Sequence, residues 1–109
     1  MEVAAGLIKV KPGVEGSVQN WTETMRERVD EALITLREEG VEIESWFELE
    51  IEEDKYLLWY MRAESIEKIW SAFEQSEHEI DHFHLNTMTA ISEGSIPTSP
   101  LVDLCTNGS

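Results

Sequence analysis

Residues 43–61 read IESWFELEIEEDKYLLWYM, and this stretch decides the fold. From Ile43 to Ile51, apolar side chains alternate with mostly acidic ones, which is the period of two expected of a half-buried strand. A polar break follows at Glu53-Asp54, and Tyr56 to Met61 is a second apolar run. The two runs predict an antiparallel β-hairpin.

The position of the turn determines which side chains lie opposite each other in this hairpin. A turn at Glu53-Asp54 sets Trp46 opposite Met61 and Glu48 opposite Trp59, and successive side chains then point to opposite faces. One face carries Phe47, Leu49, Ile51, Tyr56, Leu58 and Tyr60. The other face carries Glu44, Trp46, Glu48, Glu50, Leu57, Trp59 and Met61.

The segment before the hairpin predicts one strand and one long helix. Val3 to Val10 is short and apolar and is followed by Lys11-Pro12-Gly13, which indicates a strand and a turn. From Val14 to Glu39, apolar residues recur every three or four positions, as in an amphipathic helix. We expect Gly40 to end this helix.

The segment after the hairpin predicts two helices and a final strand. Ser65 is expected to cap the first helix. The inner side of that helix carries Ile66, Ile69, Trp70 and Phe73. A second helix is expected from about Glu77 to Ile91, then a loop over Gly94–Pro100 and a short closing strand over Leu101–Cys105. We expect the tail 106–109 to be frayed.

The element order β-α-β-β-α-(α)-β predicts an α+β fold of the ferredoxin-like class, formed by a single domain over residues 1–109. In this class the helices cover one face of an antiparallel sheet. We expect the uncovered face to be the one with Trp46, Leu57, Trp59 and Met61, which is too apolar to be left in water. A second copy of the sheet would cover it, so the sequence predicts a homodimer of the dimeric α/β-barrel type.

Charge and composition exclude several classes of partner. The chain has 23 acidic and 8 basic residues and a formal net charge of -15, which disfavours nucleic acids and anionic membranes. Such dense like charge suits a salt-rich environment, where ions screen it. The single cysteine, Cys105, allows no internal disulfide. With no signal peptide and no apolar run near the roughly 18 residues of a membrane span, a cytoplasmic location is expected.

Three segments carry a resemblance to a known group of proteins. They are RERVDEALITLREEG at 26–40, YLLWYMRAE at 56–64 and FEQSEHEIDHFH at 73–84. Over residues 7–90 the chain resembles a family of small acidic proteins of unknown function that is common in salt-loving archaea. The resemblance implies the architecture of the dimeric α/β-barrel superfamily, which includes cofactor-independent monooxygenases, sugar mutarotases and haem-binding proteins. It implies no particular activity, and we expect no cofactor.

The run His78-Glu79-Ile80-Asp81-His82 matches H-E-x-x-H, the pattern of zinc proteases. That chemistry needs both histidines to face an enclosed site. At about 100° per residue, Ile80 lies on the apolar side of the helix, and His78 and His82 lie on the opposite, solvent-facing side. The pattern therefore disfavours a zinc centre.

His84 falls within the apolar arc of the same helix, beside Met88. It is either a core histidine with a satisfied hydrogen bond or an acid–base group. His78, Asp81 and His84 follow one another at three-residue steps along one flank and match the family pattern, so they are the candidate catalytic residues. Asp81 is placed to orient His84, and we expect it to raise the pKa of His84 above about 6.5.

Trp46, Glu48, Trp59 and Met61 are the candidate ligand-binding residues. Their face can be a dimer interface, where Trp and Met are common. It can also be the aromatic wall of a pocket, because its carboxylates suit a small polar or cationic ligand better than a dry interface.

Three functions remain open from the sequence. The first is a small-molecule binding or accessory protein without catalysis of its own. The second is a cofactor-independent enzyme, mutarotase-like or monooxygenase-like, that uses His84 and Asp81. The third is a metal-binding protein that uses the segment His78–His84.

Overall fold

The hairpin forms as β2 (Val41–Ile51) and β3 (Asp54–Ala63) in the computed structural model, which describes residues 1–106. Its turn is Glu52-Glu53, one residue earlier than predicted. Both turn residues have positive φ, 49° and 74°, as a tight two-residue hairpin turn requires.

This turn changes the register but leaves the two faces as predicted. Trp46 pairs with Trp59 instead of Met61, and Glu48 pairs with Leu57 instead of Trp59. The shift is two residues, and an even shift keeps every side chain on its face of the sheet.

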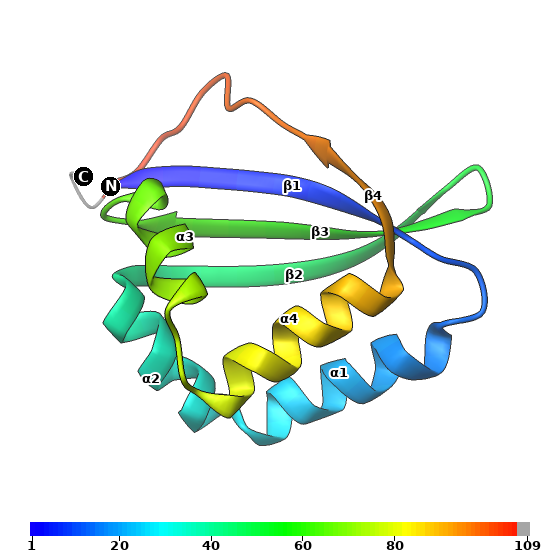
Figure 1. Ribbon diagram of the computed structural model, residues 1–109. Coiled ribbons are helices and arrows are strands. Elements are labelled where there is room, and N and C mark those ends of the chain that lie inside the picture. The colour runs from blue at the N-terminus through cyan, green and yellow to red at the C-terminus, as the bar shows by residue number, and fades with distance from the viewer. Residues whose placement is uncertain (107–109) are drawn as a thin grey trace.

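The sheet has four antiparallel strands in the order β2-β3-β1-β4. Its remaining strands are β1 (Glu2–Val10) and β4 (Ser92–Pro97). The helices are α1 (Glu15–Glu27), α2 (Val29–Glu39), α3 (Ile66–Glu74) and α4 (Glu79–Ile91). A pair of helices therefore makes each crossover, and the α+β architecture is ferredoxin-like, as expected (Figure 1).

The single helix predicted over Val14–Glu39 is wrong, because the chain breaks at Arg28. The Arg28 N–H still donates to the Thr24 carbonyl at 2.8 Å, but its φ and ψ of -104° and 32° are not helical. Its guanidinium donates two hydrogen bonds to the carboxylate of Glu31 in the first turn of α2, from Nε at 2.6 Å and from Nη2 at 2.7 Å. The break lets α1 run beside α4 while α2 turns toward the start of β2 (Figure 1). Gly40 ends α2 in the left-handed conformation, at φ 78°.

The last strand also differs from its prediction. β4 follows α4 without a connecting loop and occupies part of the segment predicted as a loop, Gly94–Pro100. Leu101–Cys105 forms no strand, and Leu101 is 95% exposed. β4 is an edge strand, so its sequence SEGSIP needs neither a regular apolar period nor an N–H at Pro97. The predicted frayed tail lies, for residues 107–109, outside the described residues.

The helices cover the opposite face of the sheet from the one we expected. Leu57 and Met61 are 3% and 5% exposed, and they pack with Trp46 and Trp59 beneath the helices. Two apolar clusters form this core. One contains Val41, Met61, Ala63 and Ile69, and the other contains Val10, Leu57 and Ile91.

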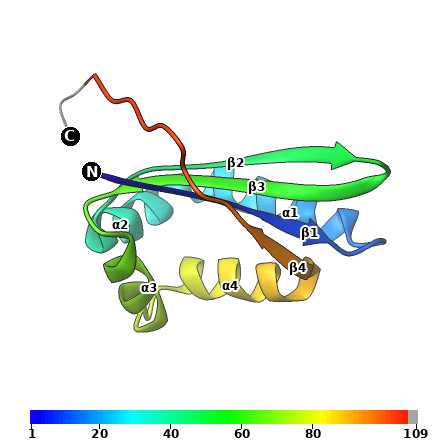
Figure 2. The ribbon, with the colours of Figure 1, turned by 90° about the horizontal axis from the view of Figure 1, so that it is seen from above.

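The open face of the sheet therefore carries the other set of side chains. Register partners align Phe47, Leu58, Leu7 and Ile96 in one apolar row across all four strands. Phe47 and Ile96 are 54% and 45% exposed. Seen from above, α3 and α4 lie on one side of the sheet, and no helix within residues 1–106 lies over this row (Figure 2). Within the same residues, no helix is long and apolar enough to cross a membrane.

Candidate functional site

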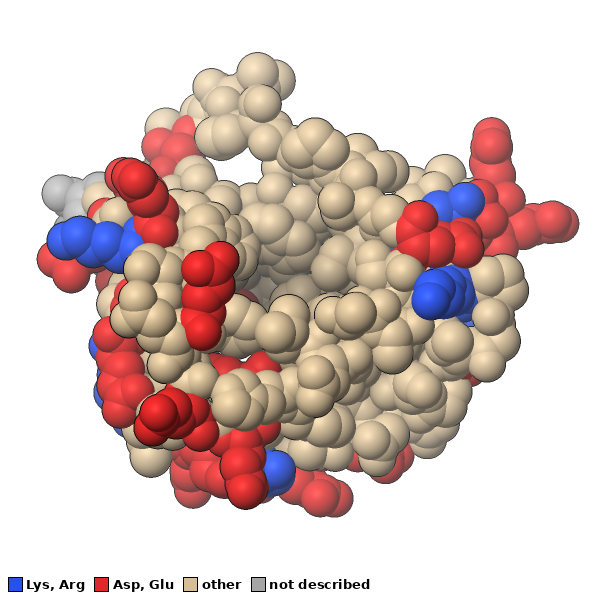
Figure 3. Space-filling model, in the orientation of Figure 1, with Lys and Arg blue, Asp and Glu red and all other residues tan. Residues whose placement is uncertain are grey.

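A cavity of about 250 Å³ lies between the sheet and the helices, where the two core clusters meet. We refer to it as the central cavity. Its aromatic walls are Trp46, Trp59, Trp70 and Phe73, and its titratable side chains are Glu39, Glu44, Asp81 and His84. Figure 3 shows the hollow in the face formed by α3, α4 and the sheet. Uncharged atoms line its visible part, and the acidic side chains nearest to it lie on its left in this view.

Three carboxyl groups lie together at one end of the cavity, which we call the acidic end. They are Glu39 at the end of α2, Glu44 on β2 and Asp81 in the first turn of α4. Burial, with the charges of Asp81 and Glu44, raises the pKa of Glu39 to about 7. Burial also raises the pKa of Glu44, although the Trp46 indole N–H donates to its Oε2 at 3.0 Å and opposes that shift. One of these groups can therefore exchange a proton near neutral pH.

His84 accepts a hydrogen bond at one ring nitrogen, which leaves the other nitrogen of the neutral ring as a donor. The Trp21 indole N–H donates to its Nδ1 at 3.0 Å. Because an indole N–H can only donate, Nδ1 carries no proton and the neutral ring carries its proton on Nε2. Burial lowers the pKa of His84 to about 4, with Asp81 opposing the shift, so the expected rise above 6.5 is wrong. Trp21, Trp46 and Phe73 enclose the ring, at centroid distances of 5.8, 5.3 and 6.1 Å.

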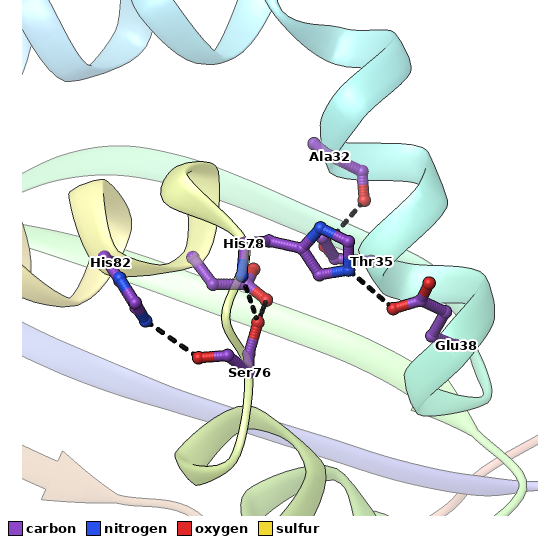
Figure 4. A network of polar contacts seen from close by, with 7 residues as sticks. Ala32, Thr35, Glu38, Ser76, His78 and His82 are labelled. Atoms are coloured by element: carbon purple, nitrogen blue, oxygen red, sulfur yellow. Dashed lines mark hydrogen bonds and ion pairs between the residues drawn. The ribbon is translucent and has the colours of Figure 1, made fainter.

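The side chains of the predicted trio, His78, Asp81 and His84, do not form one hydrogen-bonded group. Asp81 and His84 both line the central cavity, but the carboxylate of Asp81 accepts from the Ser76 hydroxyl at 2.5 Å and has no hydrogen bond to His84. His78 lies outside the cavity, and its Nε2 contacts the Glu38 carboxylate at 2.7 Å across to α2 (Figure 4). That carboxylate raises the pKa of His78.

The H-E-x-x-H histidines point to different partners. His78 reaches Glu38, whereas Nε2 of His82 contacts the Ser76 carbonyl at 2.8 Å (Figure 4). His78 precedes α4 as its N-cap residue, so the two rings do not repeat on one helical face. Across residues 1–106, no group of three or more His, Cys, Asp or Glu side chains could hold a metal ion.

Three of the four predicted ligand-binding residues line the central cavity, namely Trp46, Trp59 and Met61. Glu48 does not. It lies farther along β2 and is exposed. The face is thus the wall of a cavity within the single chain, and the prediction that it is the dimer interface is wrong.

Two residues of the site, Glu39 and Trp21, were not predicted from the sequence. Glu39 stands beside Glu38 at a helix end, where paired glutamates are typically solvated, and it is residues from other elements, Glu44 on β2 and Asp81 on α4 among them, that lie close to it. Trp21 fits the apolar period of α1, but its partner His84 is 63 residues away. No local pattern predicts that hydrogen bond. A buried Trp does, however, need an acceptor for its N–H.

Comparisons with known proteins identify the family and the fold. The family of unknown function DUF6176 matches residues 1–106. No curated protein matches the sequence. Among solved structures, the L-rhamnose mutarotase of Formosa agariphila is 20% identical, with a TM-score of 0.62 over 95% of this chain and 99% of that one. A structural-genomics target protein of Agrobacterium tumefaciens is 14% identical, with a TM-score of 0.58 over 87% of this chain and 86% of that one. At these identities the two structures show the ferredoxin-like, dimeric α/β-barrel fold alone.

Proposed function

Since the chain belongs to DUF6176, a family of unknown function, we propose from the central cavity that it is a small-molecule binding protein. One observation carries the proposal. The middle of the core is a hollow of about 250 Å³ lined by aromatic rings and titratable groups. An unfilled core lowers stability by roughly 24 cal/mol per Å³ of cavity. A concave apolar space with a few polar groups is the usual form of a ligand site.

Filling the cavity tests this proposal. Ala32 lines the hollow from α2, so Ala32→Leu places extra methyl groups in it. Ala90→Leu adds the same groups to an exposed position of α4 and is the matched control. A thermal-shift screen with sugars, quinones, haem and organic amines should find compounds that stabilise the wild type and Ala90→Leu but not Ala32→Leu. If every stabilising compound also stabilises Ala32→Leu, the cavity is not the binding site.

A second candidate function is acid–base catalysis without a cofactor, which the neighbouring ionisation states of Glu39 and His84 favour. Groups whose environments push their pKa values in opposite directions are typical of acid–base sites. Between a mutarotase and a monooxygenase, the structural similarity to an L-rhamnose mutarotase supports the mutarotase. In this proposal the Glu39 carboxyl protonates the ring oxygen as the C1–O bond breaks, and the Asp81 carboxylate takes the proton of the anomeric hydroxyl. The neutral His84 donates to a sugar oxygen, and closure on the other face of C1 returns both protons.

Anomer exchange measured by NMR tests the enzyme. L-Rhamnose and other free sugars should exchange anomers faster with the wild type than with Glu39→Gln or Ala32→Leu at equal protein concentration. Equal rates for all three proteins would show that surface carboxylates, rather than the cavity, cause any exchange.

The open face of the sheet supports a proposal on assembly. Phe47, Leu58, Leu7 and Ile96 form an apolar row that a second copy of the sheet would cover. The protein would then be a homodimer, joined through the opposite face from the one predicted.

The composition supports a proposal on environment. A net charge of -15 suits a salt-rich cytoplasm, where ions screen the repulsion between the carboxylates. The lone cysteine suits a reducing compartment.

A further inference from the structure

We propose that the ligand of the central cavity is an organic cation, an ammonium group on a compact apolar body. This inference rests on the proposed binding function and adds the chemical class of the ligand. The charged side chains of the lining are the carboxyl groups of Glu39, Glu44 and Asp81, and the lining contains no Lys or Arg within the described chain. His84 adds no positive charge, because its ring is neutral.

The acidic end is only partly compensated within the protein, since His78 alone among the groups that act on Glu39 favours its charged form. Glu44 accepts one hydrogen bond from Trp46, and Asp81 accepts one from Ser76. Across residues 1–106, Glu39 accepts no hydrogen bond, and its neighbours Asp81, Glu44 and Glu38 repel its charge. Carboxylates in a partly dry site are unfavourable unless a counter-charge and donors accompany them. An ammonium group supplies both.

The walls suit the rest of such a ligand. The rings of Trp59 and Trp70 meet edge to face at a centroid distance of 6.1 Å on one side of the cavity, and Trp70 is 48% exposed. Trp46 stands nearer the acidic end, since it hydrogen-bonds Glu44. Aromatic faces attract cations and the methyl or methylene groups attached to them. An anionic ligand would meet three carboxyl groups and no cation.

Matched pairs of compounds test the charge requirement. Choline and its neutral carbon isostere, 3,3-dimethylbutan-1-ol, form one pair. 2-Phenylethylammonium and 2-phenylethanol form the other. Calorimetric titration at pH 8 in 0.5 M NaCl screens diffuse attraction to the acidic surface. We expect at least one cation to bind about tenfold more tightly than its neutral partner.

Two variants test whether the carboxylates of the acidic end attract the cation. Glu44→Gln and Glu39→Gln should each weaken binding of the preferred cation several-fold and leave the neutral partner unchanged. Glu27→Gln, at an exposed position of α1, removes the same charge outside the cavity and should change neither. Lowering the pH from 8 to 6 should weaken cation binding, because Glu39, faced by Asp81, Glu44, Glu38 and His78, then takes up a proton.

The outcomes separate this inference from the proposed function. If the neutral compounds or the sugars bind as tightly as the cations, and Ala32→Leu abolishes that binding, the cavity is a binding site but not for cations. If neither cation binds more tightly than its neutral partner, the inference is overturned. If no compound in the full screen depends on the cavity, the proposed function fails with it.

Discussion

The indole of Trp59 lies directly over Gly6, its register partner on the neighbouring strand. A Cβ added to Gly6 would fall 2.8 Å from Cζ2 and 2.9 Å from Nε1 of that ring. Real Cβ contacts are not this short, so the wall of the central cavity depends on the missing side chain.

Gly6→Ala should therefore displace Trp59 and narrow the cavity. We expect a loss of about 1–3 kcal/mol in the free energy of unfolding, as for other overpacked cores, and weaker ligand binding. Gly16→Ala is the control, since a Cβ there meets nothing within 4 Å and the position is helical. It should stabilise the protein by up to about 1 kcal/mol. Urea denaturation measures the free energy of unfolding of both variants. Equal changes in the two would show that Trp59 moves aside at no cost in stability.

The hydrogen bond from Trp21 should fix the tautomer of His84. In the wild type, long-range proton–nitrogen NMR correlations should show His84 with its proton on Nε2 alone at pH 7. Trp21→Phe keeps an aromatic ring but removes the donor, so the ring should populate both tautomers and the protein should lose about 1–3 kcal/mol of stability. His82, held by the Ser76 carbonyl, is the internal control and should not change. A wild-type His84 with its proton on Nδ1 would contradict the structure.

The buried carboxyl of Glu39 should make stability depend on pH. Its pKa rises from 4.5 in the unfolded chain to about 7 in the folded one, so the folded protein binds the extra proton between these values. Stability contributed by the neutral carboxyl is complete below pH 4.5 and falls as the pH rises toward 7. Glu39→Gln should remove this fall and stabilise the protein at pH 8, on the order of 1 kcal/mol after allowance for solvent screening.

The effect of Glu39 must be measured as a difference between variants, because His84 changes stability with pH in the opposite direction. Its pKa falls from 6.5 to about 4, so its contribution is present above pH 6.5 and is lost as the pH falls toward 4. The measurement is denaturation of the wild type, Glu39→Gln and the surface control Glu27→Gln between pH 4.5 and 8. The difference between the variants gives the part of the pH dependence of the free energy of unfolding that Glu39 causes. A Glu39→Gln profile parallel to the wild type would contradict the raised pKa.

The row on the open face should control association. Phe47→Asp places a charge at the β2 end of the row, on its most exposed ring, and should convert a dimer into a monomer of 12.5 kDa. Ile34→Asp is the control, because Ile34 is exposed to a similar extent, 47%, on the surface of α2. Light scattering after size-exclusion chromatography in high salt gives the mass directly. A wild type that elutes as a monomer at micromolar concentration would rule out the dimer.

The alternation of residues 43–61 predicts the hairpin and both its faces, but it does not predict which face the helices cover. Phe47, Leu49 and Leu58 on one side are as apolar as Trp46, Leu57 and Trp59 on the other. The face that also carries Glu44 was predicted to be the open one, whereas Glu44 lies at the acidic end of the cavity beneath the helices. The packing of the helices determines which face is covered, and this cannot be predicted from the sequence of the strands.

The break at Arg28 is equally invisible in the sequence. Met25, Val29 and Ala32 continue the helical period through it, and neither Gly nor Pro marks it. The chain bends there because α1 packs on α4 while α2 packs on α3 and β2. Propensity and period are local quantities, and they yield to tertiary packing of this kind. The site depends on that bend, since Glu39 comes from α2 and Trp21 from α1.

The direct junction between α4 and β4 has a mechanical consequence. At this junction Ile91 is fully buried and its carbonyl accepts the Lys11 N–H at 2.8 Å, so one end of α4 is pinned to the sheet. The other end contacts α2 through side chains, from His78 to Glu38 and from Glu79 to Arg28, the residue that precedes α2. In a swing of α4 about Ile91, the displacement of each residue would grow with its distance from that pivot. Asp81 then travels farther than Met88, so the hollow widens first where its carboxylates are.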